Sequence, residues 1–414
     1  MKTACDNYET ALTRRGLLAA GGTLIGMSKA LAQVAINPRR ESECVMVVLF
    51  LRGGADGLNM IAPYAEDAYY RLRPSLAIAR PSSKVGRQDK LLDLDGYFGL
   101  HPKLEPLLPY FLDKQLSVVH AVGSQDRTRS HFEAMSAMER GVATAASTES
   151  SGWLARYLDA TNASGPMRAV AFSSIMPDSL RGAPGAIAIE SLADYKLQIP
   201  PSFEPTRVVD KIKSLHSHGD DQMSVAGRET LSVLESLRQV SLASVAQYPN
   251  TDIGRALNEV AVLIRSGVGL EIACLDVGGW DTHVVQGGST GLQANLLDTL
   301  ASAVAAFAQD LKERMKSVSV VIMTEFGRRV YENTGLGTDH GTASVMMVLG
   351  GGVQGGRIQG NWPGLKENDV DNDLAATTDY RTVLGDVLQG AMGFADRAAV
   401  FPGAPIGSGV IRYS

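Results

Sequence analysis

The sequence predicts an α/β protein with a predominantly parallel central sheet flanked by helices. Short apolar runs rich in β-branched residues recur along the chain and are typical of strands buried on both faces. Amphipathic helical stretches lie between them, so strand and helix alternate as they do in a parallel sheet. Several runs also end abruptly in glycine followed by acidic or imidazole side chains. Open α/β sheets bind their ligands at this edge, the carboxyl ends of the strands.

The length and composition suit one large domain without nucleic acid as a partner. At 414 residues and 45% hydrophobic, the chain can bury one large core or two moderate ones. The formal net charge is −5 and no basic stripe is visible, which argues against nucleic-acid binding. We expect a single α/β domain over residues 43–414, with residues 151–250 as a cap or insert.

Residues 1–32 are expected to be a twin-arginine (Tat) export signal rather than part of the fold. Arg14 and Arg15 precede an apolar run of small residues, and Ala30-Leu31-Ala32 supplies an A-x-A cleavage site before Gln33. The run is too short to serve as a stable membrane anchor. We therefore expect the Tat translocase to be a partner during export, and the mature protein to be periplasmic or secreted.

The chain has three cysteines, of which Cys5 leaves with the signal. Cys44 and Cys274 lie in predicted strands, where buried thiols are more common than a disulfide. In an oxidising compartment a disulfide between them stays open as an alternative.

The first predicted strand, residues 44–51, ends at a glycine-rich loop that contains Asp56. Glycines let the backbone turn sharply and bring the carboxylate to the ligand edge of the sheet. The alternative is an ordinary Gly/Asp turn.

The second predicted strand, residues 116–121, leads through a loop into a helix that starts near Ser130. Ser130 and Glu133 match the capping-box pattern S-x-x-E. A hydroxyl at a helix N-terminus also lies in a positive field, which suits a nucleophile. Arg127 and Arg129 offer forks for a phosphate or sulfate. Together with the adjacent His131, these residues form the candidate catalytic group.

Residues 151–250 carry weaker signals. Residues 169–172 and 186–189 are expected to be short strands. His216 and His218 resemble metal ligands, but they lie in a polar, charged stretch that we interpret as a solvated linker. A helix over 251–266 then leads back into the core.

A strand over 271–277 is followed by a glycine-led loop that contains Asp281 and His283. Because these two residues are one position apart, both can reach the same ion. A long amphipathic helix over 292–315 follows, and it delivers the chain to the run 320–323.

That run ends at Glu325, and Asp339 and His340 come shortly before the next apolar run, 345–349. A carboxylate and an imidazole at successive strand ends are the ingredients of a metal site. Taken alone, Glu325 could instead cap a turn and His340 could bond to the backbone. A final helix is predicted over 380–392.

The order of these residues resembles that of the alkaline phosphatase superfamily, which includes sulfatases and phosphodiesterases. More specifically, four motifs resemble the domain of unknown function 1501 family of Tat-exported bacterial proteins, over roughly residues 45–390. The motifs are LRGGADGLN, RSHFEA, GGWDTH and TEFGR.

The resemblance implies an alkaline phosphatase-like fold and a metal centre. It implies Ser130 as the hydroxyl nucleophile or its relic, and six metal ligands: Asp56, Asp281, His283, Glu325, Asp339 and His340. Where the superfamily has Asp-His-Gly, this chain has Phe326 in place of the histidine, so a standard two-zinc site lacks one imidazole. We expect one or two divalent ions. Mixed carboxylate and imidazole ligands suit Zn²⁺ or Mn²⁺, and the oxygen-rich Asp56/Glu325 half-site suits Ca²⁺, Mg²⁺ or Mn²⁺.

The expected function is an exported metal-dependent hydrolase of phosphate or sulfate esters, with a small-molecule or polymer substrate. The alternative is a secreted binding or assembly protein that keeps the fold and a structural ion without turnover. A metal-free serine hydrolase is disfavoured because no G-x-S-x-G surrounds Ser130. On either main alternative, Asp56, Asp281, His283, Glu325 and His340 are expected to converge on one pocket.

Overall fold

The computed structural model describes residues 44–161, 167–183, 185–193, 197–219, 221–238, 246–365, 373–405 and 409–413. The predicted export signal and Cys5 lie outside these residues. The chain forms two compact units. Of the described residues, 197–238 belong to the smaller unit and all others to the larger one.

The larger unit is built on one nine-stranded sheet and one small antiparallel sheet. The strands of the large sheet are β1 (Val45–Leu51), β5 (Leu116–Gly123), β6 (Ala169–Phe172), β7 (Ala186–Ile189), β8 (Ile272–Val277), β9 (Val318–Met323), β10 (Ser344–Gly350), β11 (Ile358–Gln359) and β12 (Thr378–Asp379). Their order is β11-β5-β10-β9-β1-β8-β6-β7, with β12 beside β5. The small sheet contains β2 (Ile61–Ala62), β3 (Leu92–Asp93) and β4 (Gly99–Leu100).

The large sheet is mostly parallel, as the sequence predicts, with β10 as the exception. β1 runs parallel to β8 and β9, and β6 runs parallel to β8 and β7. β10 is antiparallel to both β9 and β5. No described helix connects β9 to β10, and a parallel crossover usually needs one. As a result, the carboxyl ends of β1, β5, β8 and β9 share one edge of the sheet with the start of β10.

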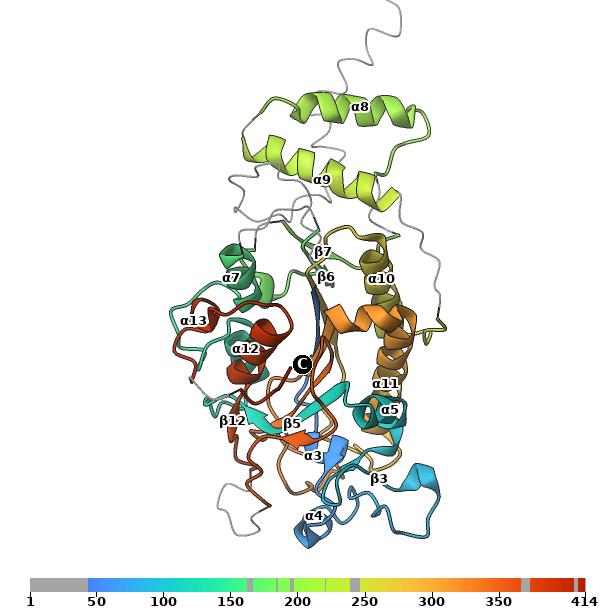
Figure 1. Ribbon diagram of the computed structural model, residues 1–414, viewed down its shortest axis with the longest axis vertical. Helices are drawn as coiled ribbons and strands as arrows, with labels where there is room; N and C mark the ends of the chain where they lie inside the picture. Colours follow the sequence, from blue (N-terminus) through green and yellow to red (C-terminus); the bar gives the residue numbers. More distant parts are fainter. Residues whose placement is uncertain are drawn as a thin grey trace, which may run out of the picture. The chain divides into compact units, whose positions relative to one another are not determined.

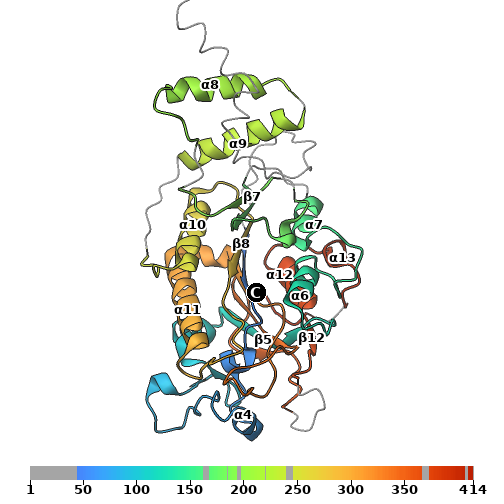
Figure 2. The ribbon, with the colours of Figure 1, turned by 180° about the vertical axis from the view of Figure 1, so that it is seen from behind.

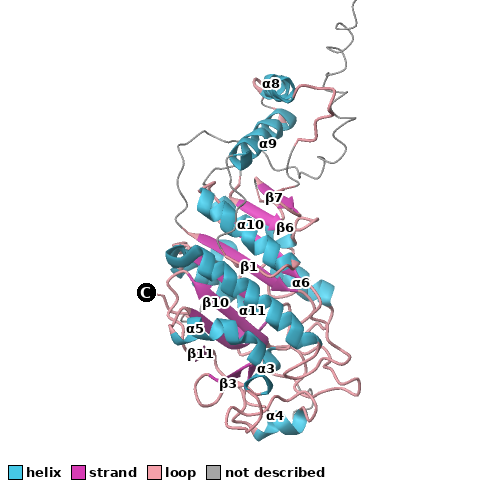
Figure 3. Cartoon of the chain, turned by 90° about the vertical axis from the view of Figure 1, so that its right-hand side faces the viewer, coloured by secondary structure: helices cyan, strands magenta, loops and turns pink. Residues whose placement is uncertain are grey.

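Helices cover both faces of the sheet (Figures 1, 2 and 3). One face carries α5 (Leu108–Leu112), α10 (Asp252–Ser266) and α11 (Leu292–Leu311). The other carries α6 (His131–Glu139), α7 (Trp153–Ala160), α12 (Tyr380–Gly390) and α13 (Arg397–Val400). Short helices α3 (Gly57–Met60) and α4 (Asp67–Leu72) follow β1, and 3₁₀ turns occupy Arg87–Asp89, Pro102–Leu107, Asp178–Leu180 and Lys312–Ser317.

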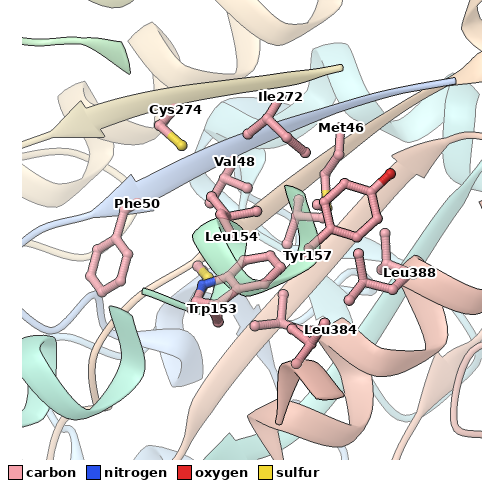
Figure 4. Close-up of a cluster of buried hydrophobic side chains, with 14 of the residues drawn as sticks. Met46, Val48, Phe50, Trp153, Leu154, Tyr157, Ile272, Cys274, Leu384 and Leu388 are labelled. Carbon is pink, nitrogen blue, oxygen red and sulfur yellow. The ribbon is translucent and has the colours of Figure 1, made fainter. Parts of the chain in front are cut away.

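The hydrophobic core follows from the two-residue period of β1. Met46, Val48 and Phe50 point to one face, where they pack in one cluster with Trp153 of α7 and Leu384 of α12 (Figure 4). Each large apolar side chain buried in this way contributes about 1.5–3 kcal/mol to stability. Residues 45–51 are all buried, so β1 is covered on both faces.

Both ends of helix α10 are set by residues that are recognisable in the sequence. The hydroxyl of Thr251 accepts a hydrogen bond from the amide of Gly254 at 3.2 Å, which caps the N-terminus. Gly267 ends the helix in the left-handed conformation at φ 62°. The helix predicted over 251–266 is confirmed, as are the predicted strands 169–172 and 186–189.

The region predicted as a cap or insert, 151–250, is divided between the two units. Its first part supplies α7, β6 and β7 to the larger unit. Its second part forms α8 (Pro205–His216) and α9 (Gln222–Arg238), which belong to the smaller unit.

Cys44 and Cys274 form no disulfide with each other. Burial raises the pKa of the Cys274 thiol, which keeps it protonated and unreactive. No helix in the described residues is both long and apolar enough to cross a lipid bilayer.

Two histidines, His101 and His120, are buried as neutral rings. In His120, Nε2 lies 2.9 Å from the carbonyl of Ile61, and Nδ1 accepts from the amide of Ala121 at 2.8 Å. His101 is held in the same way between the carbonyl of Gly288 and the amide of Lys103. Burial lowers the pKa of each ring to about 4.

We therefore expect stability to fall as the pH drops from about 6.5 to about 4. The unfolded chain takes up protons on these two residues in that window and the folded chain does not, so each contributes a loss on the order of 3 kcal/mol. Urea unfolding measured at several pH values tests this. The variant His120→Gln should be less stable at pH 7 but should show a shallower dependence on pH. An unchanged slope in that variant would contradict the assignment.

Candidate metal centre

Three imidazoles and one carboxylate meet at the carboxyl edge of the large sheet. His131 begins α6, Asp281 and His283 lie in the loop after β8, and His340 lies in the loop before β10. The ligand atoms of His131, Asp281 and His340 all lie within 4.8 Å of one another. His283 joins them, because its Nε2 is 2.8 Å from Nε2 of His340 and 3.1 Å from Oδ1 of Asp281.

The other nitrogen of each ring, Nδ1, is held by an oxygen acceptor. For His131 the acceptor is Oε1 of Glu325 at 2.6 Å, and for His283 it is Oδ1 of Asp339 at 3.2 Å. For His340 it is the backbone carbonyl of Arg129 at 2.7 Å. In a neutral ring these acceptors favour the proton on Nδ1, while Oδ1 of Asp281 lies 3.1 Å from Nε2 of both His283 and His340 on the other side. With the protons on Nδ1, the three Nε2 atoms carry lone pairs.

These lone pairs make the cluster suitable for a metal ion. Nε2 of His131 is buried, lies 3.4 Å from Oδ2 of Asp281 and makes no hydrogen bond. With the protons on Nδ1, the Nε2 atoms of His283 and His340 face each other at 2.8 Å, and a cation near both would relieve the repulsion of their lone pairs. A carboxylate or carbonyl on the far nitrogen is the usual arrangement around metal-binding histidines. Three imidazoles and one carboxylate are ligands that Zn²⁺ accepts readily.

The electrostatic surroundings keep Asp281 charged and His340 neutral. Burial by itself would raise the pKa of Asp281, but the hydrogen bond from Arg328, the contact with His340 and the charge of Arg328 lower it to about 2. Burial lowers the pKa of His340 below its ordinary value. Both shifts favour the protonation states that metal ligands need.

The cluster is open to solvent on one side. The side chain of Asp281 is 46% exposed and that of His283 is 37% exposed. The other two rings, His131 and His340, are about one-fifth exposed. A closed structural zinc site would shield its ligands, whereas a catalytic site leaves room for a water or substrate oxygen.

Arg328 fixes the loops that carry the cluster. Its side chain is fully buried and donates to the carbonyls of Gly53, Gly54, Trp280 and Thr338. It also donates to Oδ1 of Asp281 at 2.6 Å. One guanidinium therefore joins the loops after β1 and β8 to the loop between β9 and β10.

His131 brings a third imidazole to the cluster, next to Phe326. The sequence predicts a catalytic role for His131, but the structure places its ring among the candidate ligands. Phe326 is buried and packs against two of the imidazoles, with ring centroids 4.8 Å from His131 and 4.9 Å from His340. The available signal was the position of His131 at a helix start beside the ligand edge.

Asp56 does not join the cluster. Its fully buried carboxylate forms a two-pronged ion pair with Arg73, at 2.6 and 3.0 Å, and accepts from Nε2 of Gln286 at 2.6 Å. Both oxygens are therefore used inside the fold. The expectation that Asp56 converges with the other four residues is wrong on this geometry, because burial without a counter-charge would be costly and Arg73 supplies that charge.

Glu325 and Asp339 lie beside the cluster and position its histidines. Glu325 is buried and also accepts from the amide of Gly53 at 2.8 Å and the hydroxyl of Thr324 at 3.0 Å. Asp339 accepts from Nδ2 of Asn333 at 2.9 Å. Hydrogen bonding to Asn333, followed by the contact with His283, lowers the pKa of Asp339.

Ser130 is the N-cap residue of α6, but the predicted capping box does not form. Its side chain makes no capping hydrogen bond, and Glu133 instead accepts from the hydroxyl of Thr128 at 2.5 Å. Arg129 pairs with Asp373 at 2.8 Å. Arg127 lies exposed in the same loop.

A family model described as "Protein of unknown function (DUF1501)" matches residues 44–386. No curated protein matches the chain.

Several solved structures resemble this chain with low TM-scores and low sequence identity. The C-terminal periplasmic domain of EcEptC from Escherichia coli is 9% identical, with a TM-score of 0.36 over 89% of this chain and 92% of that one. The same domain in complex with Zn is 10% identical, with a TM-score of 0.32 over 74% and 73%. The alkaline phosphatase from the Antarctic bacterium TAB5 is 10% identical, with a TM-score of 0.27 over 74% and 92%. At these TM-scores the similarities carry no argument about this chain.

We expect His131→Ala to weaken Zn²⁺ binding by more than about 100-fold. Losing a residue that only orients a ligand already costs 10–100-fold, and His131 offers a ligand atom itself. Competition with a chromophoric chelator measures the affinity, and elemental analysis gives the stoichiometry.

Two variants serve as controls for this measurement. His218→Ala removes an exposed histidine of the smaller unit and should leave Zn²⁺ affinity unchanged. Asp56→Asn should also keep the ion, while lowering the unfolding free energy by roughly 3–5 kcal/mol because Arg73 loses its buried partner. Loss of zinc in Asp56→Asn with stability intact would instead make Asp56 a ligand.

Proposed function

The chain belongs to the DUF1501 family, and from that premise we propose that it is a metal-dependent hydrolase of phosphate or sulfate esters. The observation that carries the proposal is the convergence of three imidazole Nε2 atoms with the carboxylate of Asp281 at a solvent-open edge. A purely structural arrangement would not leave a buried Nε2 of His131 without a hydrogen bond.

A divalent ion held by these four residues would supply Lewis acidity toward an ester oxygen and lower the pKa of a nearby hydroxyl. The residues around the ion would position the ester and the attacking hydroxyl. Ser130 lies between Arg129, whose carbonyl holds His340, and His131, whose ring belongs to the cluster. The residues before and after Ser130 therefore both contact the candidate metal centre.

The hydroxyl of Ser130 is the candidate nucleophile in this proposal. It makes no capping bond to its own helix, so attack on an ester would not sacrifice a stabilising contact. The amides at the start of α6 favour negative charge in front of them. The guanidinium of Arg129 adds a positive charge in the same loop, where it is 43% exposed.

The proposal specifies one ion rather than two, with zinc as the preferred metal. The ion pair with Arg73 removes Asp56 from the ligands that a second ion would need. An imidazole-rich set also suits Zn²⁺ better than Ca²⁺ or Mg²⁺, which take oxygen ligands.

The second candidate function is a secreted binding or assembly protein with a structural ion. It is favoured by the same ion pair of Asp56, because a single ion leaves only Arg129 and the helix N-terminus to stabilise a leaving oxygen. Turnover separates the two candidates.

We expect Ser130→Ala to lower kcat at least about 1,000-fold while Zn²⁺ content stays at the wild-type level, since removing a nucleophile abolishes the covalent route. Hydrolysis of a phosphate monoester, a phosphate diester and a sulfate ester by the zinc-loaded protein measures this. The stability of the variant should change little, because no capping bond is lost.

Ser136→Ala is the matched control on the same helix and should leave kcat unchanged. Undiminished turnover in Ser130→Ala would remove Ser130 as the nucleophile. Absence of turnover in the wild type on all three ester classes, with zinc bound, would favour the second candidate.

We further propose that residues 1–32 direct export through the Tat pathway, on the twin arginines, the apolar run and the cleavage site. Replacing both Arg14 and Arg15 by lysine should leave the precursor inside the cell. Cell fractionation with an immunoblot measures this, and the intact signal serves as control. Unchanged accumulation of the mature protein outside the cytoplasm would contradict the Tat assignment.

A further inference from the structure

Three exposed apolar side chains lie beside the candidate metal centre. Val284, Val285 and Leu336 are 61%, 58% and 52% exposed, and we refer to these three residues as the apolar rim. Val284 directly follows the candidate ligand His283. Large apolar side chains gathered at the surface often mark a binding site.

The apolar rim and His283 belong to one hydrogen-bonded unit. The amide of Val285 donates to the carbonyl of Gly335, and the amide of Gln286 donates to that of Leu336, both at 2.9 Å. Nδ2 of Asn333 donates to the carbonyl of His283 at 3.0 Å, and to Asp339, which holds the ring of His283. The rim is therefore fixed relative to the metal centre.

Two residues of the rim are held in a strained backbone conformation. Val285 has φ 50° and Leu336 has φ 58°. A positive φ is unusual for any residue with a side chain and is an outlier for a β-branched one such as valine. Such strain costs on the order of 1–3 kcal/mol and clusters at ligand-binding sites. The chain carries Val and Leu at positions where Gly would be unstrained.

We propose that the ester bound at the metal centre has an apolar alcohol group and that the apolar rim binds this group. The inference rests on the proposed function. The rim adjoins His283, so a group that touches it can belong to the same molecule as the anion at the ion. The rim presents methyl groups, whereas a sugar or other polar alcohol would need hydrogen-bond partners there. The ligand is thus an anionic ester with an alkyl or aryl alcohol.

Alkylphosphonates test the inference without requiring turnover. The zinc-loaded protein is titrated calorimetrically with methylphosphonate, butylphosphonate and octylphosphonate. Each fully buried methylene is worth about fourfold in affinity, so the rim should raise affinity at least tenfold from methyl to octyl.

Two variants test whether the apolar rim causes the increase in affinity with alkyl chain length. Leu336→Asn keeps a residue type that tolerates positive φ, and Val284→Thr keeps the shape of the side chain. In each, the octyl-to-methyl affinity ratio should fall to about a third of the wild-type ratio or less. Val85→Thr, at an exposed valine outside the centre, should leave the ratio unchanged.

The possible outcomes separate the inference from the proposed function. Binding of all three phosphonates with equal affinity overturns the role of the rim and leaves the proposed function standing. No binding of any phosphonate overturns both. If the protein instead binds phosphatidylcholine vesicles through Leu336 while the phosphonates show no dependence on chain length, the rim contacts a lipid surface and the inference is wrong.

Discussion

The buried guanidinium of Arg328 is the interaction on which the candidate centre depends. Its three nitrogens donate to four backbone carbonyls and one carboxylate, which come from loops at the ends of separate strands. A lysine could not satisfy this geometry, because it presents a single point charge rather than a rigid fork. The same group lowers the pKa of Asp281 and so keeps a negative charge among the three imidazoles.

The centre shows how a fold can prepare a cation site through groups that never touch the cation. Glu325, Asp339 and the carbonyl of Arg129 each bind the far nitrogen of one ring. With the protons on Nδ1, the Nε2 lone pairs of the three rings face one another, and they repel unless a cation is present. Phe326 packs against the rings of His131 and His340, and the buried carboxylate of Glu325 binds His131. Asp281 and His283 stay accessible to solvent.

The buried pair of Asp56 and Arg73 distinguishes this chain from the two-ion pattern that its motif order resembles. Arg73 also donates to the carbonyls of Arg329 and Val330, so it joins the loop after β1 to the segment after β9. Asp56, in the loop after β1, therefore stabilises the fold. The candidate centre that remains contains three imidazoles and one carboxylate.

The sequence alone determined the class of fold, most strands and helices, and the region of the site. Buried strands and amphipathic helices have periodicities that are visible in the chain, and residues after parallel strands must gather at one edge. Asp281, His283 and His340 were found in this way. Only the tertiary structure decided that Asp56 pairs with Arg73, that His131 lies beside Asp281 and His340, and that Glu325 and Asp339 bind the far nitrogens of two rings. These roles depend on which partners lie within about 3 Å, and those partners come from distant segments whose loops have no periodic pattern to predict them.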